Sequence, residues 1–229
     1  MASLVFIHGS GCTGDVFAAQ SAAFPDSVAL TLAGHATPGA PSTIAEMADD
    51  VAAQCSAHGL RDIILVGNSM GGAVALDLVL REDERICAAV LIGSGAKLRV
   101  APAIFEAIES DFPAAARMLA GYFFYKPRPE LIDPAVAEML RVGPSQTGRD
   151  YRACDAFDVS DRLHHVSIPL LALTGEYDVM TPPKFGAFIA DRVPGAVARI
   201  VPAAGHLAMV ERPDDTNEAL RAFVDTIGS

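Results

Sequence analysis

The chain has 229 residues, of which 51% are hydrophobic and 20% are charged, which suits one well-packed globular domain with room for an inserted subdomain. Its formal net charge of −11 argues against binding to nucleic acid or to anionic membrane surfaces, because both attract cations. The apolar runs all fall short of the roughly 18 residues of a membrane span, and "MASLVFIHGSG" lacks the basic and long apolar regions of a signal peptide. We therefore expect a cytoplasmic protein.

The four cysteines are scattered at positions 12, 55, 87 and 154 without a C-x-x-C pair, which predicts reduced, mostly buried thiols. Cys55 and His58 have helical spacing, but two ligands do not make a zinc site. The glycine-rich loops lack both the G-x-G-x-x-G spacing and the lysine of a phosphate-binding loop. The sequence thus predicts no metal and no nucleotide or flavin cofactor.

Short apolar runs alternate with helical patterns along the chain. The predicted strands lie in residues 4–9, 27–34, 62–69, 87–95, 168–178 and 198–206, and the clearest helices in 42–59, 70–82, 182–193 and 212–228. Since the strands are almost continuously apolar, they are typical of a parallel sheet that is covered on both faces. The alternation predicts an α/β fold with a mostly parallel sheet of about six strands.

One interval, residues 96–155, breaks this alternation because it holds helical patterns with proline breaks and no clear strand. Its many large apolar side chains do not suit a solvated loop. We predict a helical cap inserted over one end of a core formed by residues 1–95 and 156–229, since ligands bind at the carboxyl ends of parallel strands. The alternative is a set of ordinary helices that pack on a face of the sheet.

The pentapeptide Gly67-Asn68-Ser69-Met70-Gly71 follows a predicted strand and precedes a predicted helix. A sharp strand-to-helix turn of this kind strains the serine backbone and exposes its hydroxyl, while small flanking residues allow close packing. The helix N-terminus also favours negative charge near the serine. Ser69 is therefore the predicted nucleophile, and the competing interpretation is a polar residue in a glycine-rich loop.

A serine nucleophile needs a base and an acid that orients the base. His206 lies in a loop after the last predicted strand, at the sheet edge where Ser69 is expected, and is the predicted base. We predict a structural role, and an oxyanion-loop context, for the histidine of the "HG" pair that follows the first strand. That histidine is His8. The remaining histidines are expected to be structural or exposed: His35, His58, His164 and His165.

Asp178 ends the strand "PLLALTGEYD" and is the predicted acid, with Glu176 as the first alternative. Asp155 and Asp158 are further candidates, although Asp158 resembles a helix N-cap. Glu211 precedes a helix that begins with proline, and its expected role is to complement the helix dipole. The order serine, acid, histidine is that of one hydrolase class.

A tetrahedral oxyanion needs at least two hydrogen-bond donors. The residue after the nucleophile supplies one backbone N–H, from Met70. The loop "HGSGCTG" after the first strand supplies the other, and we assign it to the N–H of Ser10, whose hydroxyl could assist.

These segments resemble the α/β-hydrolase-fold serine hydrolases. "LVFIHGSG", "LVGNSMGG", "LLALTGEYD" and "AGHLAMVERP" match that family's oxyanion loop, nucleophile turn, acid strand and histidine loop in order. The resemblance implies nucleophile Ser69, acid Asp178, base His206 and oxyanion donors Ser10 and Met70. Many members carry a strand hairpin before the "HG" strand, which here begins almost at Met1, so the sheet is expected to be shorter than theirs.

A serine at the turn argues against the aspartate-nucleophile branches of that family, and the absence of tryptophan argues against haloalkane dehalogenases and cofactor-free haloperoxidases. We expect hydrolysis of small to medium carboxylic esters, by a monomer or a homodimer. One alternative is hydrolysis of carbon–carbon bonds in meta-cleavage products, which needs a cation for the substrate carboxylate; Arg99, Arg117 and Arg128 are the candidates. Another is a ligand-binding protein with little or no turnover.

Overall fold

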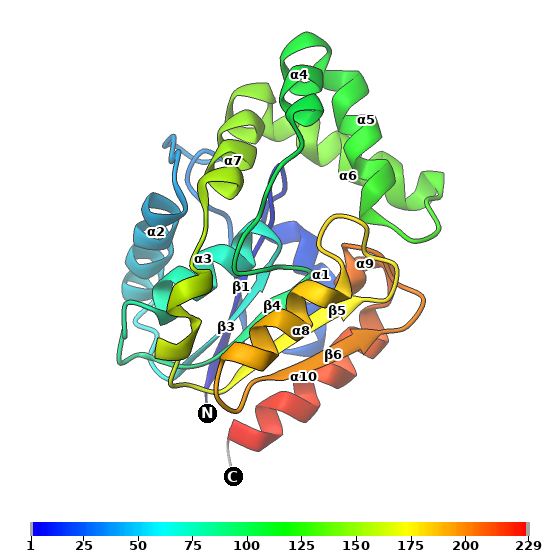
Figure 1. Ribbon diagram of the computed structural model, residues 1–229. Coiled ribbons are helices and arrows are strands. Elements are labelled where there is room, and N and C mark those ends of the chain that lie inside the picture. The colour runs from blue at the N-terminus through cyan, green and yellow to red at the C-terminus, as the bar shows by residue number, and fades with distance from the viewer. Residues whose placement is uncertain (1, 228–229) are drawn as a thin grey trace.

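The computed structural model describes residues 2–227, and its strands form one six-stranded, all-parallel sheet. The strands are β1 (Ser3–Ile7), β2 (Val28–Leu30), β3 (Ile63–Asn68), β4 (Ile86–Ile92), β5 (Leu170–Gly175) and β6 (Val197–Val201). Their order across the sheet is β2-β1-β3-β4-β5-β6, and Figure 1 labels all of them except β2. The predicted α/β fold with about six strands is confirmed, and the sheet has no antiparallel strand within the described residues.

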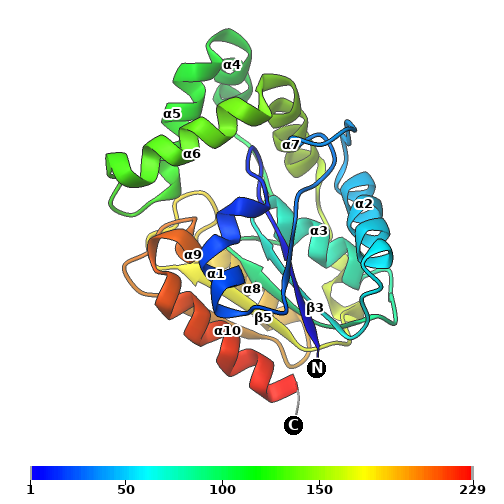
Figure 2. The same cartoon turned by 180° about the vertical axis from the view of Figure 1, so that it is seen from behind.

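Helices cover both faces of the sheet, which explains why the strands are apolar throughout rather than alternating. On one face lie α2 (Ile44–Ala57), α3 (Met70–Val79) and α8 (Pro183–Arg192), and on the other α1 (Ala18–Ala23) and α10 (Pro213–Ile227) (Figures 1 and 2). In β1, Val5 and Ile7 join the core under α2 and α3, whereas Leu4 and Phe6 join the core that contains Leu220 and Phe223 of α10.

The limits of α2 follow from its sequence. Thr43 caps the helix by accepting the Glu46 N–H at 3.1 Å, and the Glu46 carboxylate accepts the Thr43 N–H at 3.2 Å in return. Two helical segments were not predicted. One consists of η1 (Gly14–Phe17) and α1, which follows it directly in the chain; the other is α9 (Ala208–Glu211). Each is too short to show a helical period, so the sequence pattern carries no signal for them.

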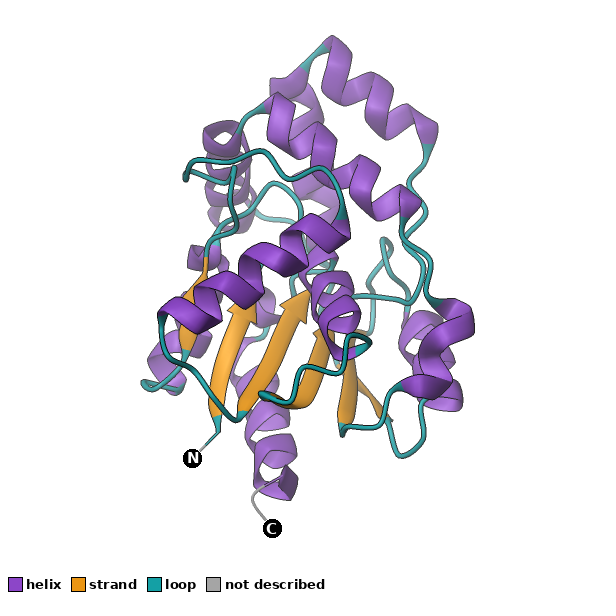
Figure 3. Cartoon of the chain, turned by 90° about the vertical axis from the view of Figure 1, so that its left-hand side faces the viewer, coloured by secondary structure: helices purple, strands orange, loops and turns teal. Residues whose placement is uncertain are grey.

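Four helices between β4 and β5 are called the cap helices here: α4 (Pro102–Ser110), α5 (Phe112–Phe123), α6 (Pro129–Val142) and α7 (Pro144–Ala156). They lie above the carboxyl ends of the strands (Figures 1 and 3), and each begins with a proline in its first turn. Leu119, Phe123 and Met139 join the core on the α10 face of the sheet. That the cap helices form a separate unit stays a prediction. No helix in residues 2–227 is long and apolar enough to cross a membrane.

Candidate active site

Ser69 occupies the turn between β3 and α3 with φ 53° and ψ −115°. Backbone in this region is rarely adopted by residues other than glycine and stores strain. The turn is held from both sides, because the Ser69 N–H donates to the Ile92 carbonyl at 2.9 Å and Ser94 Oγ donates to the Ser69 carbonyl at 2.7 Å. The backbone thus has the strained conformation that the pentapeptide motif predicts.

Close packing around this turn accounts for two of its glycines. A methyl group on Gly67 would lie 2.1 Å from the Gly71 carbonyl oxygen, and one on Gly71 would lie 2.1 Å from the Ile7 carbonyl oxygen. Both contacts are far shorter than van der Waals distance, and both involve backbone that cannot move freely. The turn therefore fits against β1 only without side chains at these positions.

His206 and Asp178, predicted from separate loops, lie together at the carboxyl edge of the sheet. His206 Nδ1 is 2.9 Å from Asp178 Oδ2, and both side chains are almost fully buried. Thr181, which follows in the same loop, donates its hydroxyl to Asp178 Oδ2 at 2.8 Å. The Met180 and Thr181 N–H groups donate to Asp178 Oδ1 at 2.9 and 2.8 Å. Every lone-pair direction of this carboxylate therefore has a donor nearby.

This environment keeps Asp178 ionised. Burial by itself would raise the pKa of Asp178, but the charge and hydrogen bond of His206 and the hydrogen bonds from Thr181 outweigh it and hold that pKa below its usual range. Glu176, the alternative acid, is exposed and accepts the Ala203 N–H at 3.0 Å. The geometry favours Asp178 over Glu176 as the partner of His206.

Ser69 and His206 line the same small cavity of about 10 Å³, which lies under the cap helices. Ser10, Asn68 and Leu207 contribute to its wall. Within the described residues the Ser69 hydroxyl makes no hydrogen bond to the His206 ring. Asn68 Nδ2 donates to the Ile92 and His206 carbonyls at 3.1 and 3.3 Å, whereas its buried Oδ1 has no partner in residues 2–227.

The loop after β1 brings Ser10 to this cavity. In the described part of the chain, neither the Ser10 N–H nor the Met70 N–H donates to a protein acceptor, so both are available to an oxyanion. The next amide is not available, because the Gly11 N–H donates to Asp150 Oδ2 at 2.9 Å. The Ser10 hydroxyl lies 3.6 Å from Met70 Sδ and 3.7 Å from Cys154 Sγ, and its assistance to an oxyanion stays a prediction.

His8 and His35 are buried away from this cavity, in accordance with structural roles. His8 Nε2 accepts the Leu32 N–H at 3.1 Å, so its proton is on Nδ1, which donates to the Gly9 carbonyl at 2.9 Å. Burial, with a contribution from the charge of His35, lowers the pKa of His8 to about 3. His35 is 2.8 Å from Asp150 Oδ2.

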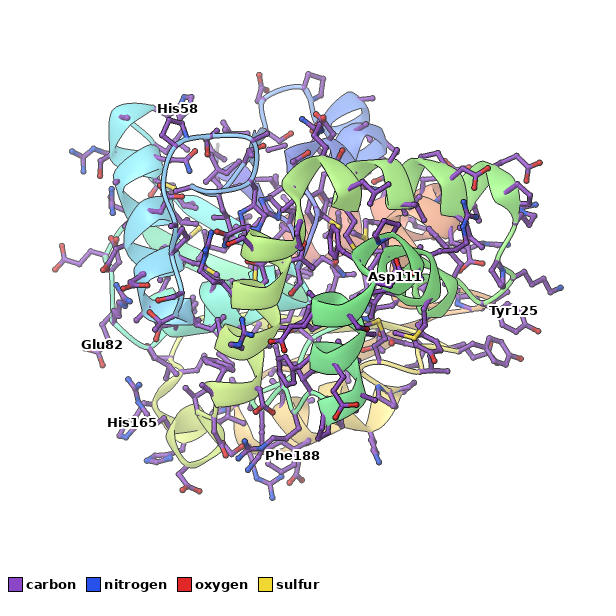
Figure 4. The ribbon with its side chains drawn as sticks, turned by 90° about the horizontal axis from the view of Figure 1, so that it is seen from above. His58, Glu82, Asp111, Tyr125, His165 and Phe188 are labelled. Atoms are coloured by element: carbon purple, nitrogen blue, oxygen red, sulfur yellow. The ribbon has the colours of Figure 1, made fainter. Side chains whose placement is uncertain are left out.

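The other histidines are on the surface. His58 ends α2, and His164 and His165 lie in η2 (Ser160–His165). All three are exposed, and Figure 4 shows His58 and His165 at the rim of the molecule, outside the cap helices. Asp158 accepts the Ser160 N–H at 3.1 Å at the start of η2, which resembles the capping role expected for it.

Thr181, Glu211 and Asp150 contact the candidate site but were not identified from the sequence as part of it. Glu211 was expected to complement a helix dipole. Its carboxylate instead accepts the N–H groups of Tyr125, Lys126 and Gly205 at 2.9, 3.0 and 2.8 Å, so it ties the loop between α5 and α6 to the histidine loop.

At the rim of the molecule the Tyr125 ring stacks on the Tyr177 ring, with ring centroids 3.8 Å apart (Figure 4 labels Tyr125). For Thr181 the available signal was its place three residues after Asp178, where a hydroxyl can reach the carboxylate.

An all-parallel sheet that is covered by helices on both faces, with a serine at a strained strand-to-helix turn, is typical of the α/β-hydrolase enzymes. The sequence profile of the alpha/beta hydrolase family matches residues 4–219, and the chain belongs to this family. It is an enzyme of the α/β-hydrolase superfamily with esterases among its neighbours, as the resemblance in the sequence implied.

The relatives include several hydrolases. The chain is 28% identical to a pimeloyl-[acyl-carrier protein] methyl ester esterase of Neisseria meningitidis, over 96% of this chain and 91% of that protein. It is 26% identical to a putative non-heme bromoperoxidase of Mycobacterium tuberculosis, over 81% of this chain and 76% of that protein. A thermophilic esterase of known structure superposes with a TM-score of 0.87 and 29% identity, covering 98% of this chain and 90% of the other. An N-acyl homoserine lactone degrading enzyme superposes with a TM-score of 0.86 and 28% identity, covering 97% and 93%.

Proposed function

We propose that this protein is a serine esterase that hydrolyses small to medium, uncharged carboxylic esters through an acyl-enzyme. The observation that carries the proposal is that Ser69, on its strained turn, shares a small cavity with His206, whose Nδ1 is held by the ionised Asp178. Three of the proteins similar to this chain are described as an esterase, a methyl ester esterase and a lactone-degrading enzyme. Ester or lactone cleavage is common to all three.

In the proposed reaction, Asp178 keeps the His206 proton on Nδ1, which leaves Nε2 free to act as the base. His206 accepts the Ser69 proton as Oγ attacks the ester carbonyl carbon. The N–H groups of Ser10 and Met70 stabilise the oxyanion. When the C–O bond breaks, His206 returns the proton to the leaving alcohol. A water molecule, deprotonated by His206, then attacks the acyl-enzyme, and the acid leaves as Ser69 recovers its proton.

A second cavity, of about 350 Å³, indicates the class of acyl group. Cys12 and Leu207 line both this cavity and the small one around Ser69, so the two spaces are neighbours. The larger cavity is mainly apolar, with Phe124 and Leu131 in its wall. The charged groups in its lining are three carboxylates, of which Asp15 and Glu138 pair with Arg141 at 3.5 and 2.7 Å, so the net charge there is negative and disfavours anionic substrates; the third is Glu130. Contact with apolar surface, rather than charge, would hold the acyl chain.

Carbon–carbon bond hydrolysis receives no support from the three candidate arginines. Arg99 donates to the Asp155 carbonyl at 3.0 Å, and Arg117 pairs with Asp133 at 3.3 Å. Arg128 precedes α6 and is exposed. None of the three lines either cavity in the described part of the chain. Among the described residues, neither arginine nor lysine is part of the lining of the two cavities.

The test is a series of p-nitrophenyl esters from acetate to octanoate, together with a vinylogous 1,5-diketone, assayed with the wild type and variants. We expect multiple turnovers of the uncharged esters, rapid labelling by a fluorophosphonate probe, and little cleavage of the diketone. Ser69→Ala and His206→Ala should each lower kcat by roughly 10⁴–10⁶-fold, and Asp178→Asn by roughly 10³–10⁴-fold. Ser110→Ala, the same change on the surface of α4, should leave kcat unaltered.

Three results would contradict the proposal in different ways. A Ser69→Ala variant with more than a tenth of the wild-type activity would remove Ser69 from the nucleophile role. Greater damage from Glu176→Gln than from Asp178→Asn would move the acid. A ligand that stabilises the protein against unfolding, without any ester turnover, would favour the ligand-binding alternative.

A further inference from the structure

Asp150 of α7 reaches from the cap helices into the loop that carries Ser10. Its side chain is fully buried. Oδ2 accepts the Gly11 N–H at 2.9 Å and faces His35 Nε2 at 2.8 Å, while Oδ1 accepts Gln146 Nε2 at 2.8 Å. The carboxylate thus joins a cap helix, the loop after β1 and the loop after β2 at one point.

The contact with Gly11 fixes the peptide that follows Ser10. Gly11 has φ +66°, and a methyl group on it would lie 3.0 Å from Met139 Cγ of α6, so the chain bends sharply under the cap helices here. The Gly11 N–H is taken up by Asp150, whereas within residues 2–227 the neighbouring Ser10 N–H has no protein acceptor. One turn along α7, Cys154 Sγ lies 3.7 Å from the Ser10 hydroxyl.

Complete burial of a carboxylate is costly unless its charge is paired and its oxygens accept hydrogen bonds. Here His35 supplies the charge: burial alone would lower the pKa of His35, but the hydrogen bond and charge of Asp150 outweigh it and raise that pKa. The His35 ring also contacts His8 edge-on, with ring centroids 4.6 Å apart, and His8 leads directly into the oxyanion loop. The buried pair therefore braces this loop from both of its ends.

We infer that Asp150 is a positioning residue for the oxyanion hole: by binding the Gly11 N–H it orients the Ser10 N–H, so the hole is complete only while α7 is seated on the core. The inference rests on the proposed serine esterase function. It assigns to the cap helices a part in stabilising the transition state, in addition to covering the substrate.

The test compares Asp150→Asn with Asp155→Asn. Asp155 lies on the same helix and accepts the Val100 N–H at 3.0 Å, so its variant makes the same chemical change at another backbone contact away from the oxyanion loop. The oxyanion probe is 1,1,1-trifluoroheptan-2-one. Ser69 Oγ adds to its carbonyl carbon, His206 accepts the hydroxyl proton, and the C=O bond opens to an anionic hemiketal oxygen. Heptan-2-one, of the same chain length, reports binding without an oxyanion.

We expect Asp150→Asn to lower kcat by roughly 10–100-fold and to raise the inhibition constant of the trifluoro ketone by a similar factor. This effect is smaller than the fall in kcat that follows removal of a complete oxyanion-hole donor. KM and the inhibition constant of heptan-2-one should change by less than about threefold, since these report ground-state binding. Asp155→Asn should match the wild type in all four quantities. Unchanged trifluoro ketone affinity in a folded Asp150→Asn protein would overturn the inference.

Two double variants keep the test decisive if Asp150→Asn does not fold. In Asp150→Asn alone, His35 Nε2 and the Gly11 N–H compete for the one remaining carbonyl oxygen, because both contact Asp150 Oδ2 in the wild type. In His35→Gln/Asp150→Asn the two amides can pair in a neutral contact that leaves this oxygen to the Gly11 N–H, and we expect that variant to keep kcat within about fivefold of wild type. His35→Leu/Asp150→Leu fills the space with apolar groups, which often preserves stability. It removes the acceptor for the Gly11 N–H, so we expect this variant to bind the trifluoro ketone more weakly than the wild type does. Equal affinity of both for the probe would refute the inference. A wild type without ester turnover would instead refute the proposed function.

Discussion

The Thr181 hydroxyl donates to Asp178 Oδ2 over 2.8 Å, and that oxygen is the one that faces His206 Nδ1 at 2.9 Å. Thr181 Oγ1 is also 3.1 Å from His206 Nδ1, so the three groups form a closed triangle. A threonine that is not part of the proposed triad thereby restricts the rotation of both the carboxylate and the imidazole.

Replacing Thr181 with valine keeps the shape and removes the donor. A hydrogen bond to a charged group contributes about 1.5–3 kcal/mol, so we expect kcat to fall by roughly 10-fold or more with KM nearly unchanged. Steady-state kinetics on one p-nitrophenyl ester measure the effect. Thr181→Ser keeps the hydroxyl and should recover most of the rate. If valine and serine gave the same rate, the hydroxyl would have no part in catalysis.

Leu207 separates the cavity at Ser69 from the larger apolar cavity, which it also lines. Leu207→Ala should join the two spaces and shift the preference among esters toward longer acyl chains by roughly 10-fold, while Leu207→Phe should shift it toward acetate. The ratio of kcat/KM for octanoate to that for acetate checks this, at a temperature below the unfolding range, since a buried Leu→Ala change costs about 2–5 kcal/mol. Leu140→Ala, on the exposed side of α6, is the control. Parallel changes across all chain lengths in both Leu207 variants would contradict the prediction.

Glu211 is expected to hold the histidine loop against the cap helices. Glu211→Gln leaves a single neutral acceptor for three backbone N–H groups, so the free energy of unfolding should fall by about 2–3 kcal/mol. For a chain of this size the midpoint of thermal unfolding should drop by roughly 4–10 °C. Glu218→Gln, on the exposed side of α10, should leave the midpoint within about 1 °C. A drop of equal size in both variants would show that the lost charge, and not the three N–H contacts, is responsible.

The His35–Asp150 pair predicts a pH dependence of stability. The pKa of His35 is raised in the folded protein above its unfolded value of about 6.5. The stabilisation that the charged pair gives to the folded protein is therefore fully present below that pH. The gain is lost as the pH rises through the folded pKa, because the folded protein then releases the extra proton. His8, beside the pair, keeps its neutral form through this range because its pKa is about 3.

We therefore expect the difference in unfolding free energy between wild type and His35→Gln to be largest near pH 5–6 and to shrink at higher pH. Urea unfolding at several pH values gives this difference directly. A difference that grows with pH would mean that His35 is neutral in the folded protein.

The sequence predicted the gathering of Ser69, Asp178 and His206 because each follows a strand, and the carboxyl ends of parallel strands meet at one edge. It did not predict the partners that come from the cap helices. Asp150 and His35 are 115 residues apart, and their contact depends on how α7 packs on the core, which a helical pattern does not specify. Nothing in the sequence around Asp150 distinguishes it from the exposed acidic residues of the same helices.

The short helices η1 and α1 illustrate the same limit at the level of the fold. Their ten residues contain too few turns for a periodic pattern, and tertiary contacts determine their structure. The strands, by contrast, were recognisable because burial on both faces imposes apolar residues at successive positions.

The space around Ser69 amounts to about 10 Å³, which is close to the smallest volume that holds one water molecule. An ester needs more room than this, so we expect substrate to bind to a more open conformer. The apparent affinity for substrate then equals the intrinsic affinity scaled by the fraction of molecules in that conformer. We therefore expect turnover to fall as solvent viscosity rises, and we expect substitutions that loosen the contacts of Glu211 or Leu207 to act on this population as well as on the chemical step.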